Sequence, residues 1–371
     1  MKPSEVALII GSIALFCLLQ AQTGPDYQEW TLQPAGAADK VRLTLDVNKR
    51  GETGRHRWRN SNDIPWAAIR GLTAEQLARH GEVKFEIAHD AGRLRCEGHA
   101  SGNKATGTFQ FVPSPSFSAE LSRLGYSAPT EEQAFRMMMS EVTLEFARTV
   151  TAANLRASTG DLLDLRVHGV DATTIEQARD AGYTDLSARD HIQFRIHGVK
   201  ADFLRGLKVA GWNYEPQDIV QLRIHGVTSD YMTDLKAAGY GSLPAHEVKN
   251  LRIHGIDKHY LRGLQSHGLT PPAGELVQMR NHGVQPDYLQ ALREAGYENL
   301  SSQETVQLRT HGVPAQFVRE ASSLGFRFSP HDLVQLRNHG VDAEYLRKLK
   351  DAGFQSLSAD KIAKLRMHGV D

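Results

Sequence analysis

The stretch LRIHGV at residues 222–227 is one copy of a motif that recurs through the C-terminal two thirds of this 371-residue chain. Its His-Gly pair returns every 28 or 29 residues, and a second marker, a Gly mostly followed by an aromatic residue, keeps the same interval. A fixed period of this length is the signature of a repeat architecture. Extended toward the N-terminus, the register reaches Asn154 and Gly125, which gives nine copies over residues 113–371.

The sequence of each copy predicts a helical hairpin. In the copy at residues 226–254, Thr228 is typical of a helix N-cap and Gly239 of a helix end, and a second helical pattern then runs up to Gly255. Helices of about ten residues cannot bury their apolar face alone, so we expect the hairpins to stack as an α-solenoid. Asn154 fits the Gly position, since Asn also tolerates the left-handed conformation.

Residues 24–112 carry a different, two-residue period. Apolar and polar residues alternate at 41–47, 83–87, 93–97 and 106–112, which predicts antiparallel strands with one buried face. Turn-forming residues separate the runs, and Thr73 predicts a short capped helix at about 73–79. The expected fold is therefore α+β, with a small β-rich domain followed by the helical array.

The N-terminus resembles an export signal. Lys2 precedes an uncharged stretch at residues 6–19, which is too short to cross a bilayer easily, and Ala21 offers a cleavage site. We expect a signal peptide at residues 1–21, a periplasmic or secreted protein and no membrane span after cleavage; an uncleaved anchor is the alternative. Cys96 would then be the only cysteine, and we expect it to be buried rather than reactive.

Composition and motifs give no sign of an enzyme. The chain has 43 Lys and Arg against 43 Asp and Glu, and 40% of its residues are apolar, as in an ordinary globular protein. It contains no metalloprotease, phosphate-loop or nucleophile-elbow motif and no Cys pair. We therefore expect a non-enzymatic protein with no cofactor and no metal site.

One histidine precedes Gly at the end of each complete copy. Successive copies would hold these side chains about one helix layer apart, whereas two ligands of one zinc ion must both lie about 2 Å from it. A His in the last turn can instead donate to free carbonyls and complement the helix dipole, so we expect helix capping. These histidines are His168, His197, His225, His254, His282, His311, His339 and His368.

An arginine lies two residues before each of these histidines. In seven of the eight copies an acid lies five residues earlier, which puts acid in the first turn and base in the last. We expect a structural ladder in which the Arg of one copy meets an acid of the next; the alternative is a binding stripe for an acidic peptide. The arginines are Arg166, Arg195, Arg223, Arg252, Arg280, Arg309, Arg337 and Arg366.

The array also resembles helix-hairpin-helix DNA-binding modules, although the second glycine of their hairpin is missing. Its net charge of about −2 is unsuited to phosphates, so no nucleic-acid partner is expected.

The whole repeat is similar to the tandem repeats that follow the membrane-bound peptidase in some bacterial antirepressor proteins of the beta-lactam-sensor type. The resemblance covers residues 90–371 and rests on the Ala-Gly-Tyr helix end and the Leu-Arg-x-His-Gly-Val motif. The peptidase itself is absent. The resemblance implies an extracytoplasmic sensing or binding module and carries over no catalytic residue.

Together these observations favour an exported scaffold that binds a protein or peptide through the helical array. A nucleic-acid-binding array is one alternative, and a small-molecule or glycan sensor in the β-rich domain is another. The last hairpin has no following copy in this sequence, so we also expect self-association through it.

Overall fold

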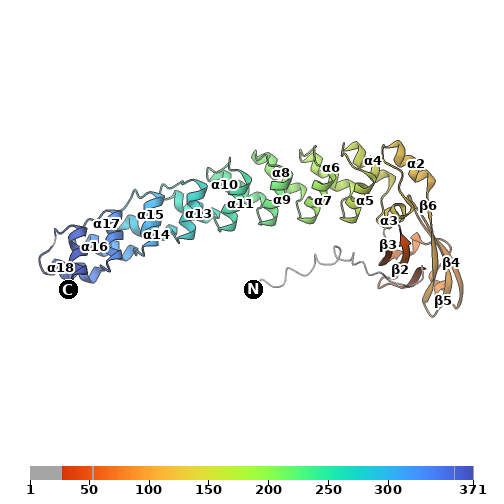
Figure 1. Cartoon of the computed structure of the whole chain (residues 1–371), viewed down its shortest axis with the longest axis horizontal. Helices are drawn as coiled ribbons and strands as arrows, with labels where there is room; N and C mark the ends of the chain where they lie inside the picture. Colours follow the sequence, from red (N-terminus) through yellow and green to blue (C-terminus); the bar gives the residue numbers. More distant parts are fainter. Residues whose placement is uncertain (1–26, 52–53, 355, 371) are drawn as a thin grey trace. The chain divides into compact units, whose positions relative to one another are not determined.

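The computed structural model describes residues 27–51, 54–354 and 356–370, with no description of the side chains of 49–56. The chain has an α+β fold, in which six strands precede a long series of helices (Figure 1). It divides into two compact units, one ending at Val167 and the other beginning at His168. The predicted signal peptide at residues 1–21 lies outside the described residues.

The strands form one antiparallel sheet in the order β3-β2-β1-β6-β5-β4. Its strands are β1 (Tyr27–Pro34), β2 (Lys40–Gly51), β3 (Gly54–Pro65), β4 (Gly81–His89), β5 (Gly92–Ser101) and β6 (Lys104–Pro113). The four predicted strands lie within β2, β4, β5 and β6 and are confirmed. β1 and β3 were not predicted; β3 is an edge strand with no buried side chain between residues 57 and 65, so its sequence carries no alternation.

Two short helical segments follow the first three strands. They are η1 (Trp66–Ala68) and α1 (Ala74–Leu77). Thr73 caps α1 through a reciprocal pair of hydrogen bonds with Gln76, as its position predicts. The turn between β5 and β6 places Gly102 and Asn103 at positive φ, the conformation that a two-residue hairpin requires.

The remaining helices form nine consecutive pairs within the described residues, and each pair consists of a first and a second helix. All of them are too short or too polar to span a bilayer. The pairs are α2 (Pro115–Arg123) with α3 (Glu131–Met139), α4 (Leu144–Ala152) with α5 (Thr159–Val167), α6 (Ala172–Asp180) with α7 (Ala188–Ile196), α8 (Ala201–Ala210) with α9 (Pro216–Ile224), α10 (Ser229–Ala237) with α11 (Ala245–Ile253), α12 (Lys258–Gln265) with α13 (Ala273–Asn281), α14 (Pro286–Glu294) with α15 (Ser302–Thr310), α16 (Ala315–Ser323) with α17 (Pro330–Asn338), and α18 (Ala343–Asp351) with α19 (Ala359–Met367).

In the first compact unit, helix α3 covers the inner face of the sheet. Phe135 of α3 packs edge-on against Trp58 and Phe111, with ring centroids 5.6 and 5.4 Å apart. Trp30 is 1% exposed and packs on Phe85, so it belongs to the core. The helical pairs α2–α5 therefore share a compact unit with the sheet, although strands give way to helices near residue 113.

In the second compact unit, successive pairs stack with the same helix of each pair in contact. First helices contact first helices of the next pair, and second helices contact second helices. Figure 1 shows α6, α8 and α10 along one edge with α7, α9 and α11 beside them. Within one pair, Met232, Leu235, Val248 and Leu251 are completely buried. Stacking therefore supplies the core that no single pair could form.

Each helix from α2 to α19 is followed by a residue in the left-handed conformation. After α9, Gly226 has φ 73°, and the amide of Val227 donates to the carbonyl of Leu222 at 2.9 Å. This is the predicted Schellman arrangement. Asn154 takes the same conformation with φ 59°, as expected from its position. After α3, Glu141 occupies the Gly position with φ 53°, which a residue with a Cβ adopts only at a cost.

Replacing Glu141 with Gly should stabilise the first unit by about 1 kcal/mol, because the left-handed conformation costs a non-Gly residue about 1–2 kcal/mol. The ion pair that would be lost joins Glu141 to Arg166 at 3.8 Å, and Glu141 is largely exposed, so the pair contributes little. Urea unfolding of the full chain measures the change. Glu141→Ala is the control, since it removes the carboxylate but keeps the strain; equal stabilisation by both variants would contradict the explanation.

His191 in α7 should make the second unit sensitive to acid. It is 3% exposed at a position that aliphatic residues fill in most other second helices, and burial lowers its pKa to about 4 despite the nearby Asp190. Because the folded pKa lies below the unfolded value of 6.5, stability is full above pH 6.5 and falls between pH 6.5 and 4, by about 3 kcal/mol at pH 4. His191→Leu should remove this dependence in melting curves recorded from pH 7 to 4. A variant that loses stability as steeply as the original chain would disprove the assignment.

Candidate binding surface

The arginine of each second helix lies over an aromatic ring of the first helix in its own pair. Guanidinium carbon and ring centroid are 4.9 to 5.6 Å apart, the geometry of a cation–π contact. Among the eight repeat arginines Arg195 is the exception, since Thr174 takes the ring position in its pair. The contacts are Arg166 on Phe146, Arg223 on Phe203, Arg252 on Tyr231, Arg280 on Tyr260, Arg309 on Tyr288, Arg337 on Phe317 and Arg366 on Tyr345.

In several pairs, the backbone carbonyl of the residue after His-Gly accepts a hydrogen bond either from the hydroxyl of the ring or from the arginine. In three of the pairs with a Tyr ring, its hydroxyl donates to this carbonyl, as from Tyr288 to Val313 at 2.8 Å. In two of the three pairs with a Phe ring, the arginine donates instead. Nη1 of Arg223 lies 2.7 Å from the carbonyl oxygen of Val227, and the Arg337 pair repeats this bond at 3.2 Å.

Two arginines in pairs with a Tyr ring also link neighbouring pairs. Nε of Arg252 donates to the carbonyl of Gly226 at 3.1 Å, and Arg309 makes the same bond to Gly283. In two of the three Phe pairs the guanidinium has turned toward its own pair, and Nε of Arg223 and Arg337 has no hydrogen-bond partner. In the third, Arg166 reaches Ser140 and Glu141 of the preceding pair. Seven of the eight arginines therefore brace the array from within and are half-buried or stacked on a ring, whereas Arg195 is exposed.

The acids do not meet these arginines as predicted. Asp190, Glu304 and Asp332 complete capping boxes with the serine three residues earlier. The ion pairs of the described residues contain no acid partner for Arg195, Arg223, Arg252, Arg280, Arg309 or Arg337. The expected Arg-to-acid ladder is replaced by the ring contacts, because residues at opposite ends of parallel stacked helices do not come together.

The histidines of the seven pairs from α6 to α19 occupy the C-cap positions of their second helices. Three of these imidazoles reach sideways to the next pair. Nδ1 of His254 lies 2.9 Å from Oδ1 of Asn281, and His311 lies equally close to Asn338. His282 contacts the hydroxyl of Thr310 at 3.0 Å. Donation from the histidine side chains to the carbonyls of their own helices stays a prediction.

Two rows of side chains remain on the outer face of the second helices. We call the first the amide row; it is half-buried or exposed and consists of Gln193, Gln221, Asn250, Gln278, Gln307 and Gln335. Three residues later on each helix, and so on the same face, is the outer row, which consists of Ile196, Ile224, Ile253, Asn281, Thr310 and Asn338. Gln335 hydrogen-bonds Asp360, whereas the other five amides have no side-chain hydrogen bond within the described part of the chain.

Sequence analysis missed both rows, although the signal was present. An amide recurs two residues before each Arg from Arg195 to Arg337, and an aliphatic residue directly precedes the first histidines. Neither position follows from the helical apolar stripe, so a search for core residues passes over them.

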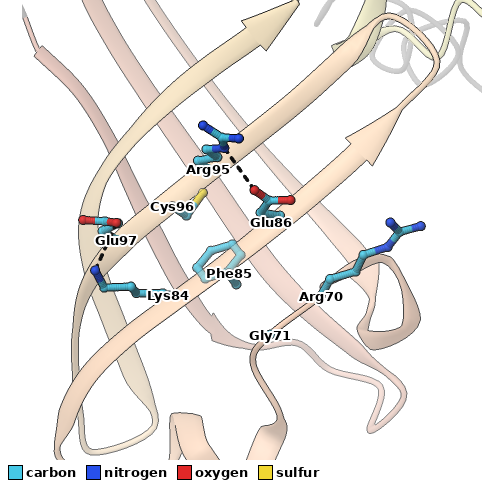
Figure 2. A pocket seen from close by; sticks show the side chains of 8 residues that line it. All are labelled: Arg70, Gly71, Lys84, Phe85, Glu86, Arg95, Cys96 and Glu97. Atoms are coloured by element: carbon cyan, nitrogen blue, oxygen red, sulfur yellow. Dashed lines mark hydrogen bonds and ion pairs between the residues drawn. The ribbon is translucent and has the colours of Figure 1, made fainter. Parts of the chain in front are cut away.

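The β-rich unit offers a second, weaker candidate, an open depression of about 420 Å³ beside β4 and β5 (Figure 2). Four of its five charged side chains are paired across the two strands, Lys84 with Glu97 and Arg95 with Glu86, each at 3.1 Å, and the fifth is Arg70. Cys96 is buried, and burial raises the pKa of its thiol to about 12. The depression therefore presents neither a reactive thiol nor an unpaired acid.

Within the described residues, no three His, Cys, Asp or Glu side chains are placed to hold a metal ion.

Tyr288→Phe should destabilise its pair by about 1 kcal/mol, because the carbonyl of Val313 loses a buried hydrogen bond unless Arg309 abandons Gly283. Hydrogen exchange of the amides in α14 and α15 measures the local change. The matched control is Tyr231→Phe: the hydroxyl of Tyr231 is buried without a partner, so its removal should be neutral or stabilising. A loss of the same size at Tyr231 would show that the hydroxyls do not act through these bonds.

No protein-family model and no curated protein matches this chain. The resemblance to the repeats of antirepressor proteins thus stays a prediction, and the functional argument rests on the residues of the chain itself.

Proposed function

We propose that this chain is a non-enzymatic, exported binding protein that engages a protein or peptide through the amide row together with the exposed aliphatic residues Ile196, Ile224 and Ile253. The observation that carries the proposal is the amide row. A side-chain amide both donates and accepts hydrogen bonds, as the main chain of a polypeptide does. A regular row of amides without internal partners therefore matches a polypeptide laid across the second helices.

The charge of this face supports an uncharged partner segment. In α9, α13 and α15 the only charged residues are one acid in the first turn and one arginine in the last. The arginines lie on aromatic rings, and the acids lie at the helix N-termini where the dipole favours them. On these three helices the outer face between them is neutral, whereas α7 and α11 each add one cation, Arg189 and Lys249. Because most of the repeat arginines lie on rings, they do not form the stripe that an acidic peptide would bind.

Nucleic acid is less well matched to the same surface. A helix-hairpin-helix module would offer backbone amides of its hairpin to a phosphate. Here the amides of Gly226 and Val227 donate to carbonyls of their own helix, at 3.0 and 2.9 Å. The donors that such a module needs are therefore already used.

The export part of the proposal rests on Lys2 and the apolar stretch at residues 6–19. A role as the sensing module of a larger system rests on the family resemblance alone.

The proposal is tested by selecting random displayed peptides on the immobilised full chain and measuring the affinity of the enriched peptides by fluorescence anisotropy. We expect enrichment, and we expect Ile253→Asp to weaken binding about tenfold or more, because it places a charge where an apolar side chain of the partner would lie. Ile253 is 53% exposed, so the variant should fold.

Thr233→Asp is the matched control, since Thr233 is an exposed residue on the first helix α10 of the same pair. It should leave affinity unchanged. Absence of any enriched peptide would refute the proposal, as would equal weakening by both variants. A labelled DNA duplex that binds with steep salt dependence would favour the nucleic-acid alternative instead.

A further inference from the structure

The outer row is divided into two chemically different halves. On α7, α9 and α11 it consists of Ile196, Ile224 and Ile253, which are 42, 49 and 53% exposed. On α13, α15 and α17 the same positions are polar, and each of these side chains hydrogen-bonds the histidine of the preceding pair. The side chains of the polar half are thus hydrogen-bonded within the protein, whereas the isoleucines of the apolar half are exposed to solvent.

The apolar half also contains polar groups without partners. The imidazoles of His197 and His225 and the amides of Gln193 and Gln221 make no side-chain hydrogen bond within the described residues. Exposed aliphatic side chains beside unused donors and acceptors are the two components of a peptide-binding surface. Both occur together on α7, α9 and α11 and nowhere else along the row.

The spacing of the helices selects one backbone conformation for the occupant. Stacked helices lie about 8 to 10 Å apart. A polyproline II chain advances about 9.3 Å in three residues and returns to the same face, whereas two residues of a β-strand advance only about 6.7 Å. A polyproline II main chain also makes no internal hydrogen bonds, so its amides and carbonyls are free to meet the amide row. A helical peptide would have none to offer.

We propose that the face formed by α7, α9 and α11 binds an extended peptide in the polyproline II conformation that has an apolar side chain at every third position. Three apolar side chains, seven residues from first to last, would lie against Ile196, Ile224 and Ile253. The side chains of Gln193, Gln221 and Asn250 would hold the main chain between them. This inference rests on the proposed function and names its ligand class and its location.

The test uses the full chain and a fluorescein-labelled peptide made of four Leu-Pro-Gln repeats. Two further peptides serve as comparisons: one alternates Leu and Gln, and one has Gln in place of every Leu of the first. We expect the Leu-Pro-Gln peptide to bind about tenfold or more tightly than either. Ile224→Asn should remove most of this preference, and since Asn fills the same position in α13 and α17, the variant should fold with an unchanged circular dichroism spectrum.

Thr310→Ala in the polar half is the matched comparison and should leave the affinity unchanged, although it removes the contact with His282. If Thr310→Ala weakens binding as much as Ile224→Asn, or if the alternating peptide binds as well as the Leu-Pro-Gln peptide, the inference is wrong. In either case, enrichment from the random library would leave the proposed function standing. If no peptide binds in either experiment, both the proposed function and this inference are wrong.

Discussion

A helix of nine residues does not hold together alone in water, and this constraint governs the array. Each helix must end at a fixed residue, reverse and pack on two neighbours before it is stable. The left-handed residue at the end of each helix makes the reversal possible, because it lets the amide of the next apolar residue return to the last turn. Gly226 adopts this left-handed conformation without strain, whereas Glu141 adopts it at a cost in free energy.

Within the stacked array, the charged residues of the second helices make structural contacts. In seven of the eight complete copies the arginine of the second helix is held by a ring of its own pair and, in some pairs, also by a carbonyl of the pair before it. The acids serve the helix N-termini. Charged residues that a sequence scan would assign to the surface therefore act as structural parts, and the outer face of the second helices is left to amides and aliphatic residues.

The repeat, the paired helices and four strands could be predicted because each rests on a local pattern. Positive φ at Asn154 followed from the same logic, since one residue type and one conformation explain it. The edge strand β3 could not be predicted, because no side chain between residues 57 and 65 is fully buried. The contact of Arg223 with Phe203 joins residues twenty positions apart in different helices, and no spacing rule within one helix reaches it.

The bond to the carbonyl after His-Gly is made within a single pair, by a tyrosine or by an arginine, and the other polar contacts reach only the adjacent pair. No contact depends on the total number of pairs. Duplication or loss of a whole pair therefore joins surfaces that already fit, whereas an insertion within a helix turns the ring or the arginine away from the other. The gene for such an array can change length in whole repeats while each interface stays intact.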